Sequence, residues 1–271
     1  MKIFAIRDET DPPRKDVAYL LYYEQSKRFY IELPDDADPW ETPLLLSSFL
    51  KRGERTVNAY WSKLWVQQRI VPPDRQNLGQ ILKANHLESY DEFALLMLAD
   101  GRCAQDNYYL VPISQSNITG KFYARFQKKV EDVVPLSNFH LLVFFRDGTI
   151  QKFDMKSAPF LGNAFLPILK DEALFSTVAI QPGGYGVCWG ETLAVADTVL
   201  YDFSDTVALS QEDFARFAEY RVVNAAEAAG LLHCSRQNIS DLVRRGRLHP
   251  VKATPKNTLF LKSEIIQRNW K

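Results

Sequence analysis

The residues from 220 to 271 carry the pattern that most constrains how this chain folds, because helix-start, turn and helix-stop signals follow one another there at short spacing. Asn224 stands before an alanine-rich segment and Glu227 comes three residues later, which is the arrangement of a capping box. Ser235 is placed to cap a second helix, whose apolar residues recur at i, i+3 and i+4. Gly246 follows two arginines and ends that helix. The sequence therefore predicts two short helices joined by a tight turn.

Two β-type runs and a last helix complete this segment. Residues 248–252 and 258–261 are the β-type runs, and residues 254–257 between them contain proline and asparagine, which favour turns. Ser263 then opens a helix that is expected to end near Trp270. Helix, turn, helix, basic hairpin and closing helix together predict a winged helix-turn-helix.

Residues 220–271 also resemble the winged helix-turn-helix of excisionases and MerR-type proteins. The resemblance is carried by Glu227-Ala228-Ala229, Ser235-Arg236 and Arg245-Gly246-Arg247-Leu248. It implies that this part of the chain binds double-stranded DNA.

The DNA-binding residues expected from this interpretation lie on a recognition helix over 235–245 and a wing over 250–260. The first side chains of a recognition helix meet base edges in the major groove, where arginine can pair with guanine and glutamine or asparagine with adenine. A serine hydroxyl at the helix start can bond a phosphate. Arginines at the far end are expected to meet phosphates or acidic protein, and wing lysines the DNA backbone or minor groove. The expected residues are Ser235, Arg236, Gln237, Asn238, Arg244, Arg245, Arg247, Lys252 and Lys256.

The charge of the chain is divided between this segment and the rest. The whole chain carries 33 basic and 33 acidic residues. Residues 220–271 hold ten basic and three acidic side chains, a net charge of 10 − 3 = +7, so residues 1–219 carry −7. Such segregation points to a polyanion-binding module attached to a body with another role. A solvated basic tail is the alternative that charge alone leaves open.

Residues 137–205 predict a small α+β domain. Residues 141–145 form a continuous apolar run typical of a buried strand, and residues 149–154 continue as a second strand after an Asp-Gly turn signal. Further strands are expected over 175–180 and 185–189.

This middle segment resembles a family of small bacterial domains known as domain of unknown function 2442. The resemblance is carried by Phe144-Phe145-Arg146-Asp147-Gly148, the strand at Phe175, Gly184-X-Gly186-X-X-Trp189 and Leu200-Tyr201. It implies a compact α+β body, which in some relatives precedes a helix-turn-helix, and no known chemistry.

The expected fold class is therefore α+β and multidomain. An aromatic hairpin over 19–33 and helices over 43–51, 58–68, 75–85 and 90–99 are predicted for the N-terminal third. The expected domains are an N-terminal β-hairpin and helical domain over 1–111, a linker over 112–136, a small α+β domain over 137–209 and a winged helix-turn-helix over 218–271.

No local motif in the sequence points to an enzyme, so no catalytic residue, cofactor or metal is expected. The four histidines are scattered without metal-ligand spacing, and Cys103, Cys188 and Cys234 stand far apart. No apolar run approaches the ~20 residues that span a bilayer. The charged N-terminus lacks the apolar core of a signal peptide. A cytoplasmic protein without membrane contact is expected.

The expected function is that of a bacterial-type, sequence-specific DNA-binding protein, a transcriptional regulator with an acidic body that can also hold a protein partner. A homodimer is expected, because one short recognition helix reads few base pairs. The alternative is a protein-interaction component of a toxin–antitoxin-like or mobile-element locus, whose basic module docks on protein without reading DNA.

Overall fold

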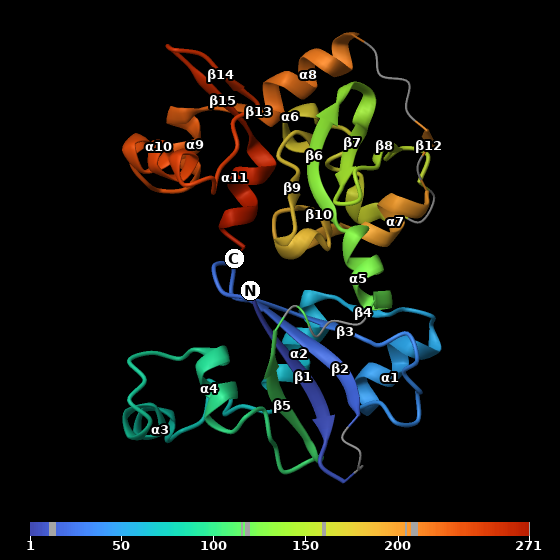
Figure 1. Cartoon of the computed structure of the whole chain (residues 1–271). Coiled ribbons are helices and arrows are strands. Elements are labelled where there is room, and N and C mark those ends of the chain that lie inside the picture. Colours follow the sequence, from blue (N-terminus) through green and yellow to red (C-terminus); the bar gives the residue numbers. More distant parts are fainter. Residues whose placement is uncertain are drawn as a thin grey trace. The chain divides into compact units, whose positions relative to one another are not determined.

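The computed structural model describes residues 1–10, 15–114, 116, 120–158, 161–203, 205–206 and 211–270. It shows a mixed α+β protein with several small antiparallel sheets (Figure 1). The chain divides into two compact units, Met1–Tyr123 and Ala124–Lys271. Residues 159–160, 204 and 207–209 of the expected small α+β domain, and Lys271 of the expected winged helix-turn-helix, lie outside the described residues. Within the described ranges, none of the helices is both long enough and apolar enough to cross a membrane.

The N-terminal unit is built on a five-stranded antiparallel sheet with the order β4-β3-β2-β1-β5. Side chains alternate between the two faces of such a sheet, and one face packs Ile6, Leu20 and Ile31 into a continuous apolar core. The predicted hairpin is therefore the centre of a larger sheet. The strands are β1 (Lys2–Asp8), β2 (Asp16–Tyr23), β3 (Arg28–Glu32), β4 (Thr56–Val57) and β5 (Tyr108–Ile113).

The four helices predicted for this unit are present, within shorter bounds. Side chains cap two of them: Asn58 accepts from the backbone N–H of Trp61, and Asp91 accepts from that of Ala94. Phe49, Trp65 and Leu96 join the core on the packed face of the sheet. The helices are α1 (Leu44–Lys51), α2 (Ala59–Gln67), α3 (Leu78–Ala84) and α4 (Glu92–Leu98).

The outer edge of strand β5 offers no backbone donor at three alternate residues. The N–H of Tyr108 donates to a carboxylate oxygen of Asp106 (3.1 Å), and the N–H of Leu110 donates to the carbonyl of Asp100 (2.7 Å). Pro112, the next residue on the same side, has no N–H. These alternate residues face away from β1, because antiparallel neighbours exchange backbone bonds only at every second pair.

The C-terminal unit is centred on a four-stranded antiparallel sheet with the order β12-β8-β7-β6. Strand β7 in the middle of this sheet is apolar on both faces because both are covered. Val143 and Phe145 face one core cluster, whereas Leu142 and Phe144 face a second cluster that packs against Phe217 of helix α8. The elements are β6 (Val130–Leu136), β7 (His140–Phe145), β8 (Ile150–Asp154), β12 (Asp205–Thr206) and α8 (Gln211–Arg221).

The expected linker over 112–136 is wrong in its second half. Residues 120–127 form helix α5 (Gly120–Gln127), and residues 130–136 form β6, which pairs along most of its length with β7. The prediction missed β6 because Glu131, Asp132 and Pro135 interrupt its apolar pattern, although most of the strand is buried.

A second, three-stranded sheet with the order β11-β10-β9 packs beside the first. The strand predicted over 175–180 is mostly absent. Asp171 caps a short helix that ends at Phe175, and only residues 179–180 are extended. The elements are α6 (Glu172–Phe175), β9 (Ala179–Ile180), β10 (Gly186–Trp189), β11 (Leu193–Ala196) and α7 (Asp197–Asp202).

After helix α8 the chain forms a compact module of three helices and a small sheet with the order β13-β15-β14. Its core contains Val223, Ala228, Ile239, Leu248 and Phe260. Two helices, a hairpin and a closing helix follow one another in the predicted order (Figure 1). A strand that was not predicted precedes them, and the first hairpin strand is confined to residues 252–253 instead of 248–252. They are β13 (Val222–Asn224), α9 (Ala225–Leu231), α10 (Arg236–Arg244), β14 (Lys252–Ala253), β15 (Thr258–Leu261) and α11 (Lys262–Arg268).

Candidate nucleic-acid interface

Helices α9 and α10 are set against each other by a capped start and a tight turn. The side chain of Asn224 accepts from the backbone N–H groups of Ala226 and Glu227, and a carboxylate oxygen of Glu227 accepts from the N–H of Asn224 (2.7 Å). This is the predicted capping box. His233, with φ of 50°, makes the turn between the helices, and Ser235 caps α10 by accepting from the N–H of Asn238 (3.2 Å).

All nine residues that the sequence analysis assigned to DNA binding are exposed. Ser235 to Asn238 form the first turn of α10 and its cap, and the side chains of this edge are open to solvent. Ile239, the next residue, is 1% exposed and anchors the helix to the module core. The leading edge of α10 is thus presented outward while the following residue holds the helix in place.

The far end of α10 is also basic and exposed. Arg244 pairs with Asp241 one turn earlier, at 2.6 Å between Nη2 and Oδ1. Gly246, with φ of 63°, ends the helix as predicted. The carbonyl of Arg247 accepts from the guanidinium of Arg268 in α11, which ties the helix exit to the last helix.

The hairpin β14–β15 carries the two remaining basic residues of the predicted site, Lys252 and Lys256. Its turn is closed by Thr254 and Asn257, whose backbone and side-chain groups exchange hydrogen bonds of 2.8–3.3 Å. Because the turn is fixed by its own bonds, Lys256 has a defined place at the tip.

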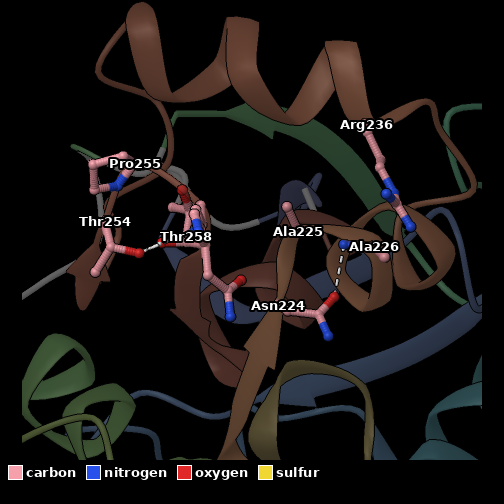
Figure 2. A pocket seen from close by; sticks show the side chains of 9 residues that line it. Asn224, Ala225, Ala226, Arg236, Thr254, Pro255 and Thr258 are labelled. Atoms are coloured by element: carbon pink, nitrogen blue, oxygen red, sulfur yellow. Dashed lines mark hydrogen bonds between the residues drawn. The ribbon is translucent and has the colours of Figure 1, made fainter.

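A groove of about 400 Å³ separates the start of α10 from the hairpin turn. Arg236 reaches from α10 toward the first residues of α9, opposite the hairpin turn (Figure 2). Lys256 lines the same groove. Arg236 and Lys256 therefore both line one open hollow between α10 and the hairpin.

The helical geometry separates Arg236 from the outermost face of α10. Each residue advances by about 100° around an α-helix, so Arg236, three positions before the buried Ile239, lies only about 60° from the core side. Gln237, Asp241 and Arg244 lie opposite Ile239, within about 40° of the outermost line. Of the residues expected at base edges, Gln237 lies on this face, whereas Arg236 turns into the groove.

Asp241 and Ser240 were not among the predicted site residues. Ser240 is exposed on the flank of α10, with its hydroxyl donating to the carbonyl of Arg236 (3.3 Å). Neither residue is a cation or an amide, the residue types expected at base edges. The spacing of the buried residues in α10 was the signal that would have placed Asp241 on the outer face.

The module is attached to the preceding sheet by a buried ion pair. Arg221, the last residue of α8, lies with Nε 3.6 Å from Oδ2 of Asp132 in β6, and its guanidinium stacks 3.7 Å from the centre of the Phe144 ring. Burial raises the pKa of Asp132 to about 6, against the attraction of Arg221. Burial also lowers the pKa of Arg221. Gln267 of α11 donates to Glu131 in the same strand (3.4 Å).

Comparison with known proteins identifies one segment of the chain. Residues 130–206 match a family described as "Protein of unknown function (DUF2442)". The resemblance stated from sequence is confirmed for this segment, and its start at Val130 falls in the stretch that had been assigned to a linker. No curated protein and no solved structure matches the chain. The module over 220–271 lies outside the matched residues.

Proposed function

We propose that this chain is a sequence-specific DNA-binding protein that acts as a transcriptional regulator, with residues 220–271 as a winged helix-turn-helix. The observation that carries the proposal is the exposed leading edge of α10, from Ser235 to Asn238, beside a basic hairpin. A recognition helix must present this end to base edges in the major groove. The net charge of +7 over the same residues supplies the attraction to phosphates.

Within this proposal, the face of α10 that contains Gln237 enters the major groove, where glutamine can pair with adenine. Arg236 and Lys256 hold a backbone phosphate in the groove between α10 and the hairpin, because both cations line that hollow. Lys252 adds a second cation on the hairpin. Contacts to phosphate position a protein on the duplex without reading its sequence.

The proposal also includes a homodimer, because one short helix covers few base pairs and regulators double their reading by two-fold symmetry. The acidic body is proposed to hold the second copy or another protein partner. Light scattering of the purified chain should give a mass near twice the monomer's 31.1 kDa. A monomer mass at working concentration contradicts this part.

The test of DNA binding is fluorescence anisotropy with a labelled generic duplex over a series of salt concentrations. Affinity should fall linearly in log–log form as salt rises, because phosphate contacts release counterions. Lys256→Ala should weaken binding to all duplexes alike and reduce the salt slope by about 1. Lys170→Ala removes the same charge from an exposed site outside the module and should leave the slope nearly unchanged.

Absence of binding to any duplex at low salt contradicts the proposal. Such a result favours the alternative of a module that docks on protein. A salt slope equally reduced by Lys170→Ala would show that binding is a property of the overall charge rather than of the hairpin.

A further inference from the structure

The outermost face of α10 contains a carboxylate between two side chains that can read bases. Gln237, Asp241 and Arg244 lie on this face, opposite the buried Ile239. The side chain of Asp241 is about one third exposed and that of Arg244 three quarters exposed. Their 2.6 Å contact joins Oδ1 of Asp241 to Nη2 of Arg244.

A negative charge at this position needs an explanation if α10 enters a DNA groove. An unpaired carboxylate is repelled by the phosphates on both sides of the major groove, and like charges brought together oppose binding. All other charged side chains of α10 and its exit, from Arg236 to Arg247, are basic. A carboxylate in this place is compatible with binding when it holds a guanidinium or accepts from a cytosine amino group.

Arg244 has the geometry to be held in this way. It stands three residues after Asp241, so the two side chains are neighbours on the helix surface. One Nη of the guanidinium is engaged by Asp241, and the fork keeps further N–H donors for a second acceptor. Arginine pairs with O6 and N7 of guanine in the major groove. A carboxylate that fixes the long side chain reduces the number of orientations that must be lost on binding.

We propose that Asp241 is a positioning residue that orients Arg244 toward guanine, so that the pair reads one G·C base pair. The inference rests on the proposed function and refines it. Arg244, expected from sequence to meet a phosphate or acidic protein, becomes a base-reading residue. Asp241, absent from the predicted site, becomes a determinant of sequence preference.

Arg245 provides a matched control within the same helix end. It is exposed and carries the same charge as Arg244, but it lies about 100° further around the helix, off the outermost face. Arg245→Ala and Arg244→Ala therefore remove equal charge from adjacent positions of different orientation.

The experiment selects duplexes from a random pool with the full-length protein and then measures affinity for every single base-pair change in the preferred duplex. Discrimination at one G·C pair should fall about 5- to 150-fold in Arg244→Ala, and Asp241→Asn should reduce discrimination at the same pair. The double variant should lose no more than Arg244→Ala alone, because both changes remove one interaction. Arg245→Ala should weaken binding to all duplexes without changing their order.

The possible outcomes separate this inference from the function on which it rests. If Asp241→Asn keeps the base preference and binds every duplex more tightly, Asp241 is only a repulsive charge and the inference is overturned. The same holds if Arg244→Ala changes affinity without changing preference, or if the two variants act at different base pairs. Failure of the wild-type protein to bind any duplex at low salt removes the proposed function itself. Circular dichroism of each variant shows whether the overall helix content is kept.

Discussion

Two glycines of the middle domain are required by backbone contacts that no other residue allows. A Cβ on Gly186 would lie 2.1 Å from the carbonyl oxygen of Val195, and one on Gly184 would lie 2.3 Å from that of Val130. Both residues also have positive φ, at 138° and 78°. The Gly184-X-Gly186 part of the family resemblance is thus explained by close backbone packing.

Gly186→Ala should destabilise the C-terminal unit, because the new methyl group meets backbone atoms of β11 that cannot move aside alone. The free energy of unfolding should fall by about 1–3 kcal/mol, the usual range for a strained backbone position. Urea denaturation, followed by the tryptophan fluorescence of the protein, measures this loss. Gly162→Ala is the control, since it has negative φ and open space around its Cβ position. Equal midpoints for the two variants would contradict the steric account.

The site residues themselves were accessible to sequence reasoning only in part. Residue type and order gave the exposed leading edge of α10 from Ser235 to Asn238, because a cap and a buried stripe define a helix face. The direction of Arg236 depends on a groove made with the hairpin, which is a tertiary contact. Asp241 was not predicted because its negative charge does not attract DNA, and its contact with Arg244 depends on side-chain orientation.

At the level of elements, local signals were reliable where an element is defined by its own ends. The capping box at Asn224, the cap at Ser235 and the stop at Gly246 predicted α9 and α10 closely. Strands were less predictable. Strand β1 was not predicted, because its burial depends on its pairing with β2 and with β5, which is distant in the sequence. The segment after Asp171 shows a cap that was overlooked. Residues 175–180 were predicted as a strand, but Asp171 caps helix α6, which ends at Phe175.

Loss of the Asn224 side chain should loosen the start of α9. Asn224→Ala leaves first-turn N–H groups without their side-chain acceptor and should lower the free energy of unfolding by about 0.5–2 kcal/mol. Asn224→Asp keeps the acceptor oxygen and should remain near wild type. Thermal unfolding by circular dichroism compares the two. If Asn224→Asp is as unstable as Asn224→Ala, the cap is not the source of the stability.

At the level of the whole molecule, a body of charge −7 carries a module of charge +7. The contact between the module and the middle domain includes a buried ion pair. Arg221 and Asp132 are both more than nine-tenths buried where α8 meets β6. Burial outweighs their mutual attraction, because the pKa of Asp132 is raised and that of Arg221 lowered. This attachment therefore responds to protonation of one carboxyl group.

The stability of the protein should carry a pH-dependent contribution from Asp132. The pKa is about 6 in the folded state and 3.8 for the unperturbed carboxyl group, so the folded state binds the proton more strongly. Linkage then makes this contribution fall as pH rises from about 4 to about 6, and it stays low above that range. Urea unfolding of wild type and Asp132→Asn at several pH values measures the difference. A difference that is constant over this range contradicts the raised pKa.

Strand β5 sets a limit on how copies of this protein can associate. An incoming strand needs a row of available amide donors along the margin it joins, and β5 has none to give at Tyr108, Leu110 or Pro112. The sheet is consequently a poor template for fibrils or strand-swapped dimers through this margin. Self-association at this margin therefore has to rely on side-chain surfaces, and it should be reversible on dilution.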